Sequence, residues 1–260
     1  MKKVEPVAPE AGERLTERIQ DFWSRRVNAE RIMGRSVTEH ERGDDAYFCD
    51  LESQRYRSHR HLLPWIETMM PAKSVLEIGC GVGLDTYTMA CHGMEVTAVD
   101  LTQVGVRTAS GRFRRHGLAG EFLVADACRL PFPDLTFDYV YSFGVLHHVA
   151  DTEQSIGEVY RLLKKGGEAR IMLYHRHSLN EIVHRLLGVP FEDKDELCPV
   201  VRRFSVAEIR ALFRDFSHVE VAIDYLFGEG YGIVFRLMPR RLYETLSRHW
   251  GWHLMIKASK

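Results

Sequence analysis

The sequence has few of the features that mark a secreted or disulfide-bonded protein. Only five cysteines occur in 260 residues. They are scattered, odd in number and form no C-x-x-C pair, which argues against both a disulfide framework and a zinc site. The N-terminal ten residues lack the apolar core of a signal peptide, and no later stretch is apolar for long enough to cross a bilayer. We therefore expect a cytoplasmic protein that does not span a membrane.

The sequence also lacks an excess of charge of either sign. It has 35 Lys and Arg against 36 Asp and Glu, for a formal net charge of -1. A balanced protein has no overall field that would draw it to nucleic acid or to an anionic membrane. No basic stripe or nucleic-acid motif is present either. We therefore expect a small-molecule partner and no nucleic acid, while the oligomeric state stays open.

The first seventy residues contain no strand pattern. Apolar residues recur at helical spacing over about 15–33 and again over 51–70. A polar turn, 41–46, separates these two predicted helices. Residues 1–70 are therefore predicted to form a helical cap ahead of the main fold, which begins at 71 and continues to 260.

From residue 74 onward short apolar runs alternate with amphipathic stretches. This alternation predicts a parallel sheet with helices on both faces, and such sheets bind ligands beyond the carboxyl ends of their strands. After 174 the order is looser, although Ser205 and Glu208 form a capping-box pattern at the start of a helix. The predicted strands are 74–79, 94–100, 120–125, 137–143, 168–174, 217–224 and 250–258, and the predicted helices are 83–92, 102–116, 152–164, 178–187 and 203–213.

The most informative segment is the end of the first predicted strand. An apolar run ends there in three alternate glycines, Gly79, Gly81 and Gly83, with Glu77 just before them. Glycines in such a turn let the backbone approach a flat ligand closely. A buried acid at the strand tip would repel the pyrophosphate of a dinucleotide. Glu77 therefore favours a cationic ligand.

Two further carboxylates follow the next two strands. Asp100 comes 21 residues after Gly79, the spacing at which an acid accepts hydrogen bonds from the ribose hydroxyls of a nucleoside. Asp126 is placed to accept from an exocyclic amino group such as that of adenine. The sequence has no G-x-x-x-x-G-K-[ST] loop, and its glycines are spaced G-x-G-x-G. Together these features predict a nucleoside site without a phosphate partner.

Several motifs in this order resemble the class I S-adenosylmethionine-dependent methyltransferases, especially the branch of ubiquinone and menaquinone biosynthesis. The resemblance covers 74–174. It implies a Rossmann-like, doubly wound, seven-stranded and mostly parallel α/β sheet with an N-terminal helical cap and C-terminal insertions. The motifs are VLEIGCGVG at 75–83, VTAVDL at 96–101, AD at 125–126 with LPFP at 130–133, FDYVYSFGVLHHV at 137–149, and LLKKGG at 162–167.

The resemblance also implies roles for individual residues around S-adenosylmethionine. The glycine turn would pack against the methionine part of the cofactor, Asp100 would hold the ribose, and the segment after Tyr141 would border the cofactor near its sulfur. The predicted cofactor-binding residues are Glu77, Gly79, Cys80, Gly81, Gly83, Asp100, Leu101, Asp126, Ala127, Ser142, Phe143 and Gly144.

Histidines near the predicted pocket are the candidates for proton transfer. His147 and His148 follow the fourth strand of the sheet, where an imidazole is placed to act as a general base or to pack structurally. With His175 and His177 they put four imidazoles near one rim. No nearby thiolate or H-x-x-x-H pair supports a metal, so we predict none. Cys80 and Cys128 are expected to behave as buried apolar groups.

The acceptor pocket is predicted to lie outside the motif region. We expect two insertions within the 71–260 domain to form the acceptor site. They are 175–215 and 225–249. The second is glycine- and aromatic-rich with flanking arginines, which favours a substrate lid over a membrane-surface contact. Within the cap, 55–61 either meets an acidic substrate or forms a solvated face, while Tyr47 and Phe48 either close over the cofactor or pack in the core.

The sequence therefore predicts an enzyme that transfers a methyl group from S-adenosyl-L-methionine to a small organic acceptor. Oxygen, nitrogen, carbon and sulfur acceptors all stay open. A nicotinamide-dependent oxidoreductase is one alternative, and Glu77 argues against it. A non-catalytic regulatory protein that binds S-adenosylmethionine is the other, because a fold does not establish turnover.

Overall fold

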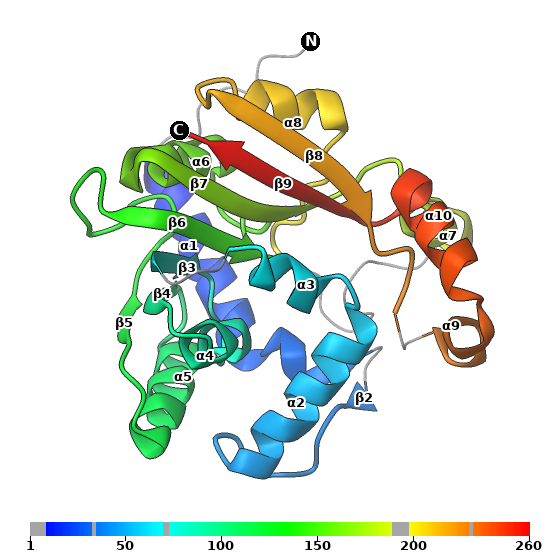
Figure 1. Ribbon diagram of the computed structural model, residues 1–260, viewed down its shortest axis with the longest axis horizontal. Coiled ribbons are helices and arrows are strands. Elements are labelled where there is room, and N and C mark those ends of the chain that lie inside the picture. The colour runs from blue at the N-terminus through cyan, green and yellow to red at the C-terminus, as the bar shows by residue number, and fades with distance from the viewer. Residues whose placement is uncertain (1–8, 33–34, 70–72, 189–197, 229–230) are drawn as a thin grey trace.

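The computed structural model describes residues 9–32, 35–69, 73–188, 198–228 and 231–260 (Figure 1). Its centre is a seven-stranded sheet whose strands lie in the order β5-β4-β3-β6-β7-β9-β8. β9 is antiparallel to both of its neighbours, and the other pairings are parallel. The predicted sheet of seven mostly parallel strands is confirmed. Its strands are β3 (Ser74–Ile78), β4 (Glu95–Asp100), β5 (Glu121–Val124), β6 (Phe137–Phe143), β7 (Leu163–Tyr174), β8 (His218–Asp224) and β9 (His253–Ser259).

Helices cover both faces of this sheet. One buried cluster joins Ile66, Met89 and Phe113 to one face. A second cluster places Ile156 and Phe213 against the other face. The helices that follow the cap are α4 (Leu84–Cys91), α5 (Gln103–His116), α6 (Thr152–Leu162), α7 (Leu179–Leu187), α8 (Val206–Leu212), α9 (Ile233–Leu237) and α10 (Arg240–Trp250).

The end of α6 differs from the prediction. The helix ends at Leu162, and β7 begins at once, not at 168 as predicted. Leu163 is extended and pairs with Phe137 of β6, so the glycine pair lies inside the strand and does not cap a helix. The capping box predicted before α8 is present, because Ser205 and Glu208 each bond to the other's backbone.

The N-terminal segment is mostly helical but is divided differently from the prediction. The single helix expected over 51–70 is two helices, because Pro64 has no N–H to continue the ladder of α2 and the chain turns at His59. The helix expected over 15–33 ends at Arg25, and a short hairpin follows. The elements are α1 (Pro9–Arg25), η1 (Asn28–Glu30), β1 (Arg31–Ile32), β2 (Arg35–Ser36), α2 (Asp45–Ser58) and α3 (Leu62–Glu67).

The strand order positions the site. The chain adds β4 and β5 on one side of β3, and then crosses over to add β6 and β7 on the other side. Loops that leave the carboxyl ends of β3 and β6 therefore diverge, and a crevice opens between them. None of the described helices is long and apolar enough to cross a membrane.

Candidate active site

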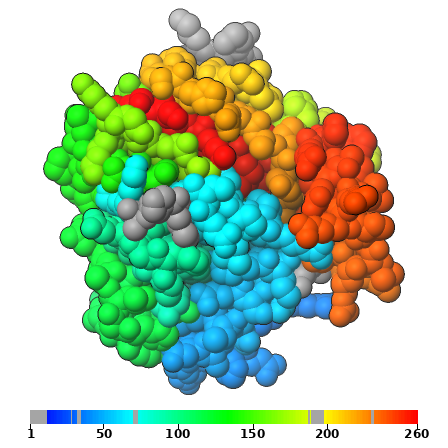
Figure 2. All heavy atoms as spheres, in the orientation of Figure 1, coloured from blue at the N-terminus to red at the C-terminus, as the bar shows by residue number. Residues whose placement is uncertain are grey.

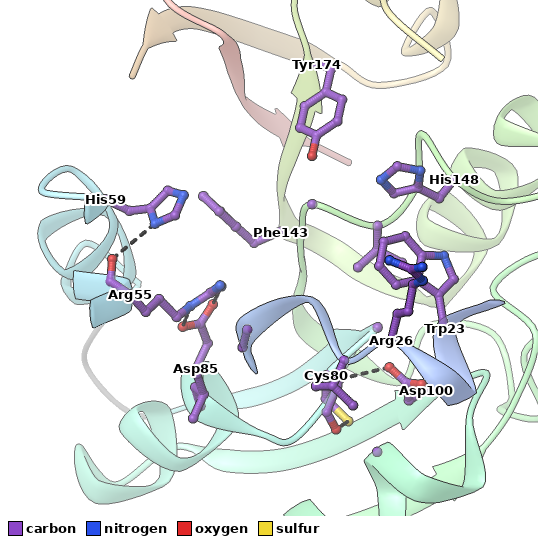
Figure 3. A pocket seen from close by; sticks show the side chains of 18 of the residues that line it. Trp23, Arg26, Arg55, His59, Cys80, Asp85, Asp100, Phe143, His148 and Tyr174 are labelled. Atoms are coloured by element: carbon purple, nitrogen blue, oxygen red, sulfur yellow. Dashed lines mark hydrogen bonds and ion pairs between the residues drawn. The ribbon is translucent and has the colours of Figure 1, made fainter. Parts of the chain in front are cut away.

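A large cavity opens at this crevice. Its volume is about 930 Å³, and its walls come from the carboxyl ends of the parallel strands, from α1 and α2, and from segments after β7 and β8 (Figure 3). Ten of the twelve predicted cofactor-binding residues line it. The two that do not are Gly83 and Ser142, while the ten are Glu77, Gly79, Cys80, Gly81, Asp100, Leu101, Asp126, Ala127, Phe143 and Gly144.

The glycine turn between β3 and α4 depends on positive φ angles and close approach. Gly79 has φ +78°, and a Cβ there would lie 2.3 Å from a methyl carbon of Val145. Gly83 also has φ +78°, and a Cβ there would lie 2.7 Å from that of Ala109 on α5. Gly83 therefore serves helix packing and the start of α4. Gly81 has open space where a side chain would stand, and its backbone lines the cavity.

Asp100 is held by the loop that it faces. Its Oδ2 accepts a hydrogen bond from the Gly81 N–H at 2.8 Å, and its Oδ1 accepts from the backbone N–H and the hydroxyl of Thr102 at 2.8 and 2.7 Å. These bonds orient the carboxylate without using all of its lone pairs. Asp126 is fixed in a similar way, because the Cys128 N–H donates to its Oδ1 at 2.9 Å. Both carboxylates border the same end of the cavity.

Glu77 is buried at the tip of β3. Burial and the nearby charge of Asp85 raise the pKa of its carboxyl, and a hydrogen bond donated by the Thr86 hydroxyl lowers it; the resulting pKa is about 8. At neutral pH the carboxyl is therefore largely protonated. A cation bound nearby would favour the charged form, as the sequence argument for a cationic ligand requires.

A buried ion pair connects the N-terminal cap to this end of the cavity. Arg55 of α2 donates to both carboxylate oxygens of Asp85 at 2.8 and 2.5 Å. The hydroxyls of Tyr141 and Tyr56 donate to the same carboxylate at 2.7 and 3.1 Å. Burial alone would raise the pKa of Asp85, but the Arg55 charge and these hydrogen bonds keep it below its usual value. The pair was not predicted, because its partners are 30 residues apart and belong to no motif.

Two adjacent histidines have different surroundings. His148 lines the cavity beside Trp23, with ring centres 5.1 Å apart. Its Nδ1 is 2.7 Å from the Val200 carbonyl oxygen. His147 is fully buried and does not line the cavity; its ring packs 3.7 Å from that of Tyr174, and burial holds its pKa well below the usual value. Ser142 is also buried, and its hydroxyl donates to the Ile78 carbonyl at 2.9 Å, which ties β6 to β3.

Residues 76–171 match the protein family described as the methyltransferase domain. This part of the chain is therefore similar to methyltransferase domains. Squalene methyltransferase 1 of Botryococcus braunii is 36% identical over 102 residues, which are 38% of this chain and 27% of that protein. A Mycobacterium tuberculosis protein named "Probable S-adenosylmethionine-dependent methyltransferase" is 28% identical over 178 residues, 68% of this chain and 60% of that one. The chain thus spans between about a quarter and three-fifths of these relatives.

A solved structure supports the same fold. A Thermotoga maritima protein, described as an S-adenosylmethionine-dependent methyltransferase and possible histamine N-methyltransferase, superposes with a TM-score of 0.64 at 21% identity. The alignment covers 93% of this chain and 99% of that one. The similarity therefore concerns the fold of nearly the whole chain, including segments outside residues 76–171.

The far wall of the cavity is a stack of aromatic and imidazole rings that sequence reasoning missed. Tyr225 lies 4.6 Å from His59 and 4.3 Å from His253, ring centre to ring centre, with nearly parallel planes. His61 joins the stack, with its Nε2 3.2 Å from Nδ1 of His253. Burial lowers the pKa of His59 to about 3 and that of His61 to about 4, so both stay neutral. No sequence motif marks these positions.

Helix α1 covers part of the cavity. Trp23 of this helix and Arg26, which follows the end of the helix, both line the cavity (Figure 3). The amide of Gln20 donates to the Leu101 carbonyl at 2.7 Å, which fixes the helix over the end of β4. Tyr47 and Phe48, by contrast, are fully buried in a small core with Val82 and Leu84, so they pack beneath the glycine turn.

The cysteines take no part in charge chemistry at this site. Cys80 lines the cavity, but burial raises the pKa of its thiol well above the usual value. Burial also raises the pKa of Cys128 to about 12. Both thiols therefore stay protonated. Within the described parts of the chain, no group of three or more His, Cys, Asp or Glu side chains is placed to hold a metal ion.

Proposed function

We propose that the protein transfers a methyl group from S-adenosylmethionine to an apolar organic acceptor. One observation carries the proposal: a single cavity joins an acidic end, at Glu77, Asp100 and Asp126, to an end walled by rings. The acidic end suits a cationic nucleoside. The other end suits an uncharged substrate, because its walls include Trp23, Phe143, Tyr174, Phe227, Tyr231 and Trp252.

The residues at the acidic end fit the cofactor that the fold implies. Asp100 would hold the ribose, Asp126 would accept from the adenine amino group, and Glu77 would balance the positive charge. The open space at Gly81 leaves the backbone accessible to a flat ligand. When bound there, S-adenosylmethionine supplies an activated methyl group, so the protein has to position the acceptor and exclude water.

His148 is our candidate for accepting the proton that the acceptor loses. Because the Val200 carbonyl can only accept, Nδ1 of His148 carries hydrogen, and the neutral ring has its basic lone pair on Nε2. His59 also lines the cavity, but a pKa of about 3 makes it a weak base. We assign His59 the role of a hydrogen-bond acceptor toward substrate. His147 supports the wall from behind Tyr174.

Residues from three segments line the acceptor end, and we assign these lining residues to substrate binding. The cap, 1–70, contributes Trp23 and His59, and the insertion 175–215 contributes Val183. The segment 225–249 contributes Phe227 and Tyr231. We also propose that the chain divides into an N-terminal cap, 1–70, and a main domain, 71–260.

A small set of further assignments follows from this one. A relative named for squalene methylation supports an apolar acceptor, and the narrower assignment to quinone biosynthesis would also bring an apolar chain into the cavity. We also propose a cytoplasmic location, which the five free thiols favour.

The test is an assay with methyl-labelled S-adenosylmethionine and an apolar lipid extract. We expect label in the organic phase together with an equal amount of S-adenosylhomocysteine. The variant His148→Gln should lower kcat by about 10²- to 10⁴-fold with little change in KM, because a general base contributes that much. His175→Gln is the matched control, since that imidazole bonds to the Gly251 carbonyl outside the cavity lining.

Three results would contradict the proposal. Cofactor binding without any S-adenosylhomocysteine would favour a regulatory binding protein. Binding of NADH without binding of S-adenosylmethionine would favour an oxidoreductase. Label found only in charged, water-soluble products would keep the enzyme class and overturn the apolar acceptor.

A further inference from the structure

Exposed apolar side chains gather on three helices beside the acceptor end of the cavity. In the described parts of the chain nine large hydrophobic side chains are exposed, and seven of them lie on α7, α9 and α10. The other two, Val124 and Leu135, stand elsewhere. The concentration is therefore a local property of this region. The seven residues, which we call the α7–α9–α10 face, are Ile182, Leu186, Ile233, Val234, Leu237, Leu242 and Trp250.

These helices are firmly packed on their inner sides. Phe235 of α9 and Tyr243 of α10 are buried together in a cluster that Leu179 of α7 also contacts. The Arg60 guanidinium lies 4.3 Å from the ring centre of Phe235, and the Tyr231 hydroxyl donates to the Asn180 side chain at 2.9 Å. The outward side chains are thus fixed on a packed lobe, of which Figure 2 shows α9 and α10 in orange at the right of the molecule.

The exposure of these side chains is large. Leu186 is 79% exposed, Leu237 73% and Ile233 69%. A monomeric protein rarely presents so many apolar groups on one face without a partner. We therefore expect the α7–α9–α10 face to contact an apolar surface of a partner.

The charges on α9 and α10 are mostly positive. Residues 231–250 include four arginines and a single acidic residue, Glu244, which pairs with Arg240 at 2.7 Å. Arg236, Arg241 and Arg248 are all exposed. Apolar side chains flanked by arginines are typical of helices that lie in the interface of an anionic bilayer. This local excess of positive charge is not reflected in the net charge of the whole chain, which is close to zero.

The same helices lead into the cavity. Val183 and His184 of α7 line it, although their neighbours Ile182 and Leu186 point outward. Tyr231, which precedes α9, lines it as well. A molecule that enters past these helices would reach the ring-walled end without crossing the sheet.

We propose that the α7–α9–α10 face docks on the surface of a bilayer that contains anionic lipid and admits an apolar acceptor from it to the cavity. The docking stands on the exposed face alone, whereas the delivery of the acceptor rests on the proposed function. The sequence favoured a substrate lid over a membrane-surface contact for 225–249, and the docking proposal corresponds to the second of these.

The test is flotation of the full chain with vesicles of phosphatidylcholine, with and without phosphatidylglycerol. We expect binding to the anionic vesicles that weakens as salt increases. Ile233→Ser with Leu237→Ser should weaken binding about tenfold or more, and so should Arg241→Gln with Arg248→Gln. The controls are Leu135→Ser and Arg210→Gln, which change exposed residues on other elements and should bind as the unaltered protein does.

Two results would overturn the docking proposal. One is vesicle binding that is absent or that the face variants leave unchanged. The other is a dimer in sedimentation velocity that the face variants dissociate, in a protein that does not bind vesicles, because the face would then bind a second copy. The face variants should keep their activity toward an acceptor dispersed in detergent. Loss of vesicle binding with that activity retained separates this proposal from the proposed function.

Discussion

The two ends of the cavity are built in different ways. At the acidic end, Glu77, Asp100 and Asp126 lie at or just beyond the carboxyl ends of neighbouring parallel strands, so they lie together because the strands do. At the acceptor end, rings come from α1, from the turn after α2 and from segments after β7 and β8. Local sequence therefore encodes the first end, whereas the second depends on how distant segments pack.

The Arg55–Asp85 pair connects the cap to the acidic end of the cavity, and its loss should strongly reduce stability. Arg55→Leu leaves a buried carboxylate without its cation, which typically costs about 3–5 kcal/mol. The measurement is the free energy of unfolding in urea. Arg214→Leu is the control, because its partner Glu153 is exposed and such pairs contribute less than about 1 kcal/mol. Equal losses in the two variants would show that the cap is not fixed to the cofactor end in this way.

The second prediction tests whether the two ends of the cavity bind different molecules. Asp100→Ala removes an acceptor for the ribose and frees the Gly81 and Thr102 donors, so cofactor affinity should fall by about 10- to 100-fold. Acceptor KM, extrapolated to saturating cofactor, should change little. Isothermal titration with S-adenosylhomocysteine measures the affinity. Asp138→Ala is the matched control, because that carboxylate bonds to Ser74 and Lys164 away from the cavity. Equal affinity of the Asp100 variant and the unaltered protein would remove Asp100 from the site.

The two ends of the cavity also differ in how much of each could be predicted from the sequence. Asp100 was predictable because an acid at a fixed spacing after a glycine turn must reach the same sheet edge. The stack of His59, Tyr225 and His253 was not predictable, because these rings are brought together by β9 and by the turn after α2. His147 and His148 were adjacent in the motif, yet only packing decided that one faces the cavity and the other lies behind Tyr174. The break in the predicted helix over 51–70 had a local signal, Pro64.

The third prediction concerns Glu77 and pH. Its pKa is about 8 in the folded protein and near 4.5 when it is unfolded, so between these values the folded state holds more protons than the unfolded state. The free energy of unfolding should therefore fall as pH rises from about 4.5 through 8. Glu77→Gln should remove this part of the slope and give a higher Tm than the unaltered protein at pH 9. Each kcal/mol gained in the free energy of unfolding corresponds to a rise of about 2–4 °C in Tm.

Cofactor binding should show the opposite preference at the same residue. A cation beside Glu77 favours the ionised carboxyl, so S-adenosylmethionine should bind more tightly as pH rises toward 8 and should release a proton on binding. Titration calorimetry in two buffers of different ionisation enthalpy measures that proton. In Glu77→Gln the release should vanish and the affinity should fall, although the variant is more stable. A variant that is more stable and binds equally well would mean that the acid at the tip of β3 does not recognise the ligand's charge.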